Sequence, residues 1–362
     1  MKSNILYIGI SGILLLNSCS TSLPKEFSEN GKEAQIYPDY TSLEVPVNIA
    51  PLNFRLDEET EDLVVSLSVE GGAQPVIVKG NDKEVQIPTN EWKKLLSSAV
   101  GKNIKYDIYA KKDGKWEHYK PFSNHVNADS IDQYLTYRLI EPSYMGSGEI
   151  GIYEFDLENG TEKAIFTNHH DHIKGNNKTQ KCVNCHTAQR NHPENKMFYY
   201  RGANGGLLLT YNGQLKKINT KCGDMFAGTI YPAWHPSLPF IAFSSNQIVQ
   251  CFSSIDPEKL QAFDYYSDLV LYDIVKNEIS SIRKTKNKQE TNPCWSGNGE
   301  YLYFNSTDTL FTKHNNPRMM LYNIYRAKFN ASNKTWGEDE LIFEPAKEGK
   351  SATYPRASAN GK

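Results

Sequence analysis

The sequence predicts an all-β fold in two domains, and its composition and repetition are the observations that predict it. Aromatic residues make up 12% of the 362 residues, and Gly, Asn, Pro and Ser recur between short apolar runs. This composition is typical of short strands joined by many turns. With 39% hydrophobic residues the chain can bury a core, and its length favours two domains over one.

The first residues have the pattern of a targeting segment. Lys2 is basic, residues 5–16 form an apolar stretch too short to span a bilayer, and the sequence Leu-Asn-Ser-Cys ends at Cys19. This ending resembles a lipobox, which implies removal of residues 1–18 as a signal peptide and acylation of Cys19. We expect an outer-membrane lipoprotein that faces the periplasm or the cell surface. A simple secretory signal or an uncleaved anchor is the alternative.

The first domain is predicted to be a β-sandwich. Residues 19–40 are polar and aperiodic and predict a tether between the lipid and the fold. Within residues 41–133, short apolar runs alternate with turn residues, and the clearest runs span residues 63–69, 75–78 and 105–109. This spacing suggests a sandwich of immunoglobulin or fibronectin type. A short helix is expected near residues 90–100, where apolar residues fall at helical spacing.

The second domain is predicted from a repeat. The segment Tyr-Pro-Ala-Trp-His-Pro around Pro232 matches Asn-Pro-Cys-Trp-Ser-Gly around Pro293, and a third copy begins around Pro355. Pro293 follows Pro232 by 61 residues and precedes Pro355 by 62. A four-stranded propeller blade spans about 40 to 50 residues, so each copy must carry insertions. Stacking such copies radially buries both faces of every sheet and limits exposed edges.

These motifs resemble the WD40-like repeats of TolB-type β-propellers. The resemblance implies a propeller over residues 134–362. The sequence departs from the family pattern at His235, which stands where the family has Ser, and the last copy stops before its first strand. We therefore expect the propeller to be incomplete in this chain, with an insertion over residues 167–195.

The predicted insertion carries the chemistry. It contains Cys182-Val183-Asn184-Cys185-His186, the CxxCH pattern in which two thiols reach the vinyl groups of one porphyrin and the adjacent imidazole binds the iron. We expect covalent haem c, with Cys182 and Cys185 as attachment sites and His186 as proximal iron ligand. The stretch through residues 196–202 also resembles lipoproteins that pair this haem motif with a TolB-like propeller.

Two alternatives remain for this motif. The cysteines could form a disulfide in an oxidising compartment, or they could hold zinc with His186 and a nearby histidine. His235 or Met197 is the candidate sixth haem ligand; a turn histidine and a core methionine are the competing interpretations.

The remaining sequence narrows the functional class. Forty basic and 42 acidic residues are spread along the chain, which argues against a nucleic-acid partner. No Ser-His-Asp spacing, phosphate loop or paired-carboxylate motif stands out, so the sequence leaves an enzymatic activity unassigned and leans against one. Cys222 and Cys251 could pair, and Cys294 is expected to pack as a small apolar residue. We predict envelope electron transfer or redox sensing with a protein partner. The alternative is a propeller that binds protein or glycan, in which the CxxCH site is structural.

Overall fold

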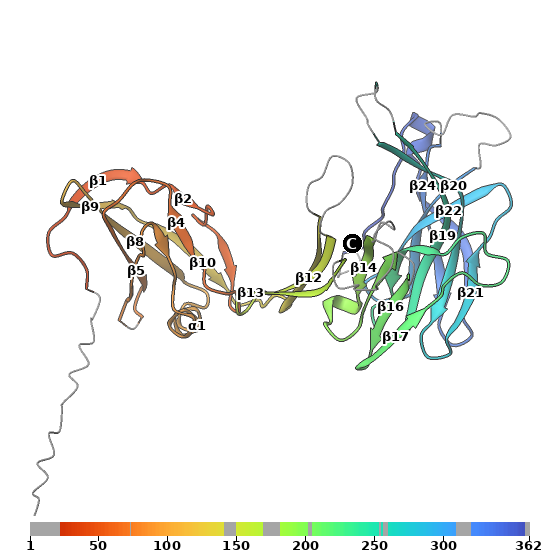
Figure 1. Cartoon of the computed structure of the whole chain (residues 1–362), viewed down its shortest axis with the longest axis horizontal. Coiled ribbons are helices and arrows are strands. Elements are labelled where there is room, and N and C mark those ends of the chain that lie inside the picture. The colour runs from red at the N-terminus through yellow and green to blue at the C-terminus, as the bar shows by residue number, and fades with distance from the viewer. Residues whose placement is uncertain are drawn as a thin grey trace, which may run out of the picture. The chain divides into compact units, whose positions relative to one another are not determined.

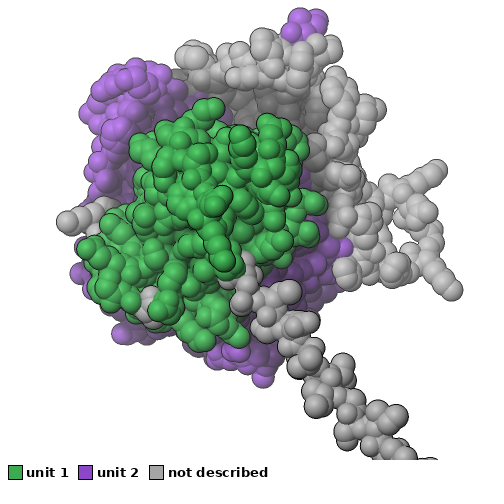
Figure 2. Space-filling view, turned by 90° about the vertical axis from the view of Figure 1, so that its left-hand side faces the viewer, with its two compact units in different colours: residues 1–133, 157–160 green, residues 134–156, 161–362 purple. Residues whose placement is uncertain are grey.

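The computed structural model describes residues 22–72, 74–140, 150–168, 182–201, 205–252, 255, 260–308 and 320–358. The predicted signal peptide and Cys19 lie outside these residues. The chain divides into two compact units, the first comprising Met1–Gln133 with Leu157–Gly160 and the second Tyr134–Asp156 with Thr161–Lys362 (Figure 2). Among the described residues no helix has the length and apolar character needed to cross a membrane.

Unit 1 is a β-sandwich of one large and one small sheet. The large sheet contains β1 (Ser28–Glu33), β3 (Glu44–Pro46), β5 (Asp62–Val69), β6 (Val76–Lys79), β8 (Asn103–Lys112), β9 (Lys115–Lys120) and β10 (Phe122–Asn127). The small sheet contains β2 (Ile36–Tyr37), β4 (Phe54–Leu56) and β7 (Glu84–Val85). Both sheets contribute to one core, in which Leu56 and Leu67 are fully buried. The predicted helix is α1 (Thr89–Ser98), which buries Trp92 in the same core.

The first strands of both sheets in unit 1 lie within the segment that the sequence predicted to be a tether. Residues 28–33 form β1, which pairs in parallel with the edge of β9, and residues 36–37 form β2. The His118 imidazole on β9 reinforces this pairing, because its Nδ1 lies 2.9 Å from the Glu29 carboxylate and its Nε2 lies 3.0 Å from Asp107 Oδ1. The tether predicted over residues 19–40 is therefore wrong from Ser28 onward.

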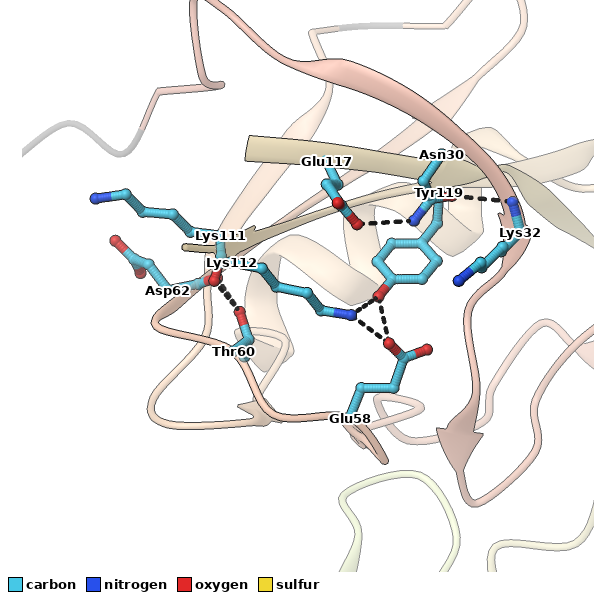
Figure 3. A network of polar contacts seen from close by, with 9 residues as sticks. All are labelled: Asn30, Lys32, Glu58, Thr60, Asp62, Lys111, Lys112, Glu117 and Tyr119. Carbon is cyan, nitrogen blue, oxygen red and sulfur yellow. Dashed lines mark hydrogen bonds and ion pairs between the residues drawn. The ribbon is translucent and has the colours of Figure 1, made fainter. Parts of the chain in front are cut away.

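A polar network fixes the chain that precedes β5 onto the β8–β9 hairpin (Figure 3). The Lys112 ammonium donates to the Glu58 carboxylate and lies 2.8 Å from the Tyr119 hydroxyl, which itself donates to Glu58 at 2.9 Å. The hydrogen bond from Lys112 lowers the pKa of Glu58. Because every member has a partner, the network orders this edge of the sandwich.

The described part of unit 2 forms four consecutive antiparallel sheets, each made of neighbouring strands in chain order (Figure 1). Sheet 1 contains β11 (Tyr134–Ile140), β12 (Ile150–Asp156) and β13 (Thr161–Thr167). Sheet 2 contains β14 (Cys182–Ala188), β15 (Lys196–Arg201), β16 (Gly206–Tyr211) and β17 (Gln214–Ile218). Sheet 3 contains β18 (Thr229–Trp234), β19 (Phe240–Phe252), β20 (Leu260–Asp273) and β21 (Glu278–Arg283). Sheet 4 contains β22 (Lys288–Trp295), β23 (Tyr301–Asp308), β24 (Asn323–Asn330) and β25 (Thr335–Phe343).

Sheets 1 to 4 pack face to face as blades 1 to 4 of a β-propeller. Ile152 of sheet 1 shares a core cluster with Val183 of sheet 2. Leu207 of sheet 2 packs in one cluster with Ile241 of sheet 3, and the next cluster joins sheet 3 to Trp295 of sheet 4. Each pair of neighbouring blades thus shares a buried core, and the predicted all-β propeller is confirmed.

In blade 3, two extended strands explain why the sequence repeat is longer than a standard propeller blade. Its central strands β19 and β20 have 13 and 14 residues, about twice the length of the corresponding strands in blade 2. The two strands pair along their whole length, from Phe240 opposite Asp273 to Phe252 opposite Leu260. The excess length of this repeat is therefore an extended hairpin.

Candidate functional site

The CxxCH motif lies in strand β14 of blade 2. β14 pairs with β15, and Val183, between the two cysteines, is fully buried and packs with Tyr200. Within its described part, residues 182–201 are strands of the blade and a short connection, so the insertion predicted over residues 167–195 does not hold there. The buried apolar contacts of Val183 explain the difference, because they place this stretch in the inter-blade core. Residues 169–181 lie outside the described residues.

The motif also occupies a repeat position that the sequence did not reveal. The pairing of β14 shifts between Asn184 and Thr187, and the first strands of blades 3 and 4 shift at the corresponding place. At each of these bulges, and again in the C-terminal copy of the repeat, one residue has positive φ: Cys185 (54°), Tyr231 (50°), Asn292 (52°) and Tyr354 (54°). Cys185-His186 therefore corresponds to the Tyr-Pro and Asn-Pro pairs of the repeat.

These bulge residues line one cavity. It has a volume of about 460 Å³, and its lining includes Cys185, Arg201, Tyr231, Asn292, Tyr322 and Tyr354. Bulges re-aim side chains out of the regular ladder, which explains why the same position of successive first strands meets here. We call this space the axial cavity. Its size is that of a small-molecule site.

The two thiols of the motif are free and half-buried. Burial raises the pKa of the Cys185 thiol, and the guanidinium groups of Arg201 and Arg138 act in the opposite direction. A disulfide between Cys182 and Cys185, left open by the sequence, is not formed in this structure.

The His186 imidazole is oriented by the neighbouring blade. Its Nε2 lies 3.2 Å from the Thr136 carbonyl oxygen of β11, to which the ring N–H donates. Burial lowers the pKa of His186, and the nearby Arg138 guanidinium adds to this effect. Nδ1 makes no hydrogen bond within the described part of the chain. A neutral imidazole with one nitrogen held by a carbonyl and the other open has the arrangement typical of metal-ligating histidines.

The donor set of this strand fits a c-type haem. Two unpaired thiols and an open nitrogen of a neutral imidazole are the groups that attachment and iron ligation use. No group of three or more His, Cys, Asp or Glu side chains that could hold a metal ion occurs among the described residues, which do not include His169, His170 and His172.

Neither candidate sixth ligand lies on the axial cavity. His235 is 2% exposed; its Nδ1 accepts from the backbone of Leu238 at 3.0 Å, and its Nε2 lies 3.2 Å from the Gly299 carbonyl oxygen. Met197 is 1% exposed and packs in the core between blades 2 and 3. Both residues therefore have structural roles, and the expectation that one of them ligates iron finds no geometric support.

The remaining cysteines have ordinary environments. Cys222 is exposed and free, with its Sγ 3.8 Å from Met225 Sδ, so the Cys222–Cys251 pair left open by the sequence is not formed. Cys294 is free and partly buried.

Sequence reasoning missed the polar groups that share the cavity with Cys185. Arg201 ends β15, Asp264 lies within the long β20, and Asn292 occupies the bulge of β22. Only Asn292 had a sequence signal, because it occupies the Tyr231 position of the repeat.

The comparisons with known proteins find similarity in fold only. No protein-family model and no curated protein matches the chain. The β-propeller domain of the Trilobed protease from Pyrococcus furiosus is 10% identical, with 67% of this chain and 62% of that chain covered and a TM-score of 0.30. Oligogalacturonate lyase from Vibrio parahaemolyticus is 9% identical, with coverages of 75% and 64% and a TM-score of 0.31.

The tricorn protease is 11% identical, with 76% of this chain and 36% of that chain covered and a TM-score of 0.19. The chain spans less than two thirds of the length of these three structures. The assignment of propeller blades therefore rests on the sheets of this chain.

Proposed function

We propose that this protein is an envelope haem protein, with haem c bound through Cys182 and Cys185 and ligated by His186, that transfers electrons or senses redox state. The observation that carries the proposal is the donor set on β14: two free thiols and a neutral imidazole with an open nitrogen. When bound, haem supplies one-electron redox chemistry.

The surrounding residues would hold this site in place. The Thr136 carbonyl fixes the orientation of the His186 ring, which keeps the other ring nitrogen available as a ligand. The Arg138 guanidinium donates to the Asn184 side chain within the motif and brings positive charge to it. That charge suits a cofactor with carboxylate groups.

Haem attachment is tested by expressing the full chain with cytochrome maturation factors. We expect a haem stain that survives denaturation and acid-acetone extraction, because thioether bonds persist where a non-covalent haem is lost. The double variant Cys182→Ser/Cys185→Ser should lose the stain, while Cys222→Ser, which removes a free thiol outside the motif, should keep it. An unstained wild-type chain would refute the proposal.

His186→Ala separates the redox function from a scaffold function. We expect this variant to keep its fold and any partner binding but to lose reversible reduction, because the iron loses its protein ligand. A variant with the complete wild-type phenotype would favour the second candidate, a propeller that binds a protein or glycan and uses the motif structurally. That candidate is supported by the position of Cys185-His186 at a repeat bulge.

We further propose that the protein is anchored to the outer membrane through Cys19. The support is the lipobox-like sequence ending at Cys19. Cys19→Ala should move the protein from the membrane fraction to the soluble fraction, as measured by immunoblotting after fractionation. Retention in the membrane fraction would count against acylation, and Cys222→Ser is the matched control.

A further inference from the structure

One basic side chain lines the axial cavity. Arg201, at the end of β15, lines the cavity with an exposed side chain. Its guanidinium makes no ion pair or hydrogen bond with any residue in the described ranges. Asp264 lines the same cavity, yet the two charges form no ion pair. A planar guanidinium that is open to a cavity is suited to bidentate binding of a carboxylate.

One buried acceptor adjoins the cavity. Asn292 is among the lining residues, but it is 6% exposed and its Oδ1 is itself buried, with no hydrogen-bond partner among the described residues. Its Nδ2 lies 3.4 Å from Asn305 Oδ1. Leaving a buried acceptor unpaired costs about 1–3 kcal/mol.

Aromatic and aliphatic side chains complete the lining. The rings of Tyr231 and Tyr354 lie 5.8 Å apart in an edge-to-face arrangement, and Tyr322, Ile230 and Met320 border the same space. Tyrosine rings offer flat apolar faces to a ligand ring, and a few polar groups then fix its orientation.

We infer that the axial cavity is a binding site for a small ring compound that carries one carboxylate. Arg201 binds the carboxylate, and the tyrosines contact the ring. Because Cys185, a proposed haem attachment residue, lines the same cavity, this inference concerns the chain without attached haem.

The test is calorimetric titration of the full chain, with free Cys182 and Cys185 thiols verified by mass spectrometry. 4-Hydroxybenzoate represents an aromatic ring and glucuronate a sugar ring of the same chemistry. We expect saturable binding of at least one probe, and the preferred probe distinguishes the two sources. Arg201→Ala should weaken binding roughly 10- to 100-fold, as expected for loss of hydrogen bonds to a charged group.

Two further variants sharpen the result. Arg201→Lys keeps the charge without the planar fork and should bind with intermediate affinity. Arg55→Ala removes an equal charge from unit 1, where Arg55 pairs with Asp57, and should leave binding unchanged. The inference is overturned if the wild-type chain binds neither probe, or if Arg201→Ala binds as tightly as the wild type. Neither result would bear on the haem stain.

Discussion

Trp295→Ala should destabilise unit 2 by about 3–5 kcal/mol, the range for removal of a large buried aromatic side chain. Trp295 is 6% exposed at the interface of blades 3 and 4. Its ring centroid lies 4.6 Å from that of His235 and 5.2 Å from that of Phe329, and its Nε1 donates to the Ala233 carbonyl at 3.0 Å. Urea unfolding followed by circular dichroism measures the loss.

Trp295→Phe is the matched control for this change. It keeps most of the ring volume but leaves the Ala233 carbonyl without its donor, so a smaller loss of about 1–3 kcal/mol is expected. If Trp295→Ala lost under 1 kcal/mol, the interface between blades 3 and 4 would not depend on this side chain.

Glu290→Gln should flatten the pH dependence of stability. Burial raises the pKa of Glu290 to about 7, and the charges of Asp268 and Asp339 add to this shift. The side chain and backbone of Thr285 act in the opposite direction but do not offset the burial of the carboxyl group. In the unfolded chain the pKa is near 4.3, so the folded state holds the proton more tightly and loses stability as pH rises from about 4.5 to 7. The shift corresponds to about 4 kcal/mol.

The measurement is the free energy of unfolding at pH 4.5 and pH 8 for both chains. Burial lowers the pKa of His235 to about 4, which gives the opposite slope below neutral pH, and this contribution cancels when the two chains are compared. Glu300→Gln, at an exposed position nearby, should behave like the wild type. Equal slopes for Glu290→Gln and the wild type would show that the buried carboxyl is already ionised.

Much of the fold could be predicted because its signals are local. The apolar run at residues 63–69 became β5, and the repeat around Pro232 and Pro293 became the first strands of blades 3 and 4. The strand β1 could not be predicted, because its sequence is polar and exposed. It exists through pairing with β9 and through the contact of His118 with the Glu29 carboxylate, 89 residues away along the chain.

The CxxCH motif could be recognised in the sequence, but its position at the bulge of β14 could not. The repeat carries Pro after the bulge and Trp two residues later, whereas β14 has His186 and Ala188 at these places. Cys185 also precedes Tyr231 by 46 residues, unlike the spacing of 61 between Tyr231 and Asn292. Side-chain periodicity cannot show a bulge of one residue, because the bulge is defined by pairing with a distant strand.

The bulges divide the first strands of blades 2, 3 and 4 into a framework part and an interchangeable part. The residues that flank the pairs Cys185-His186, Tyr231-Pro232 and Asn292-Pro293 keep the ladder register, while Cys185, Tyr231 and Asn292 stand outside the ladder and line the axial cavity. Positive φ disfavours β-branched residues there and is tolerated best by Asn, Asp and Gly. Substitutions restricted to these positions should change which ligand the inferred site prefers, one blade at a time. They would leave the cores between the blades unchanged.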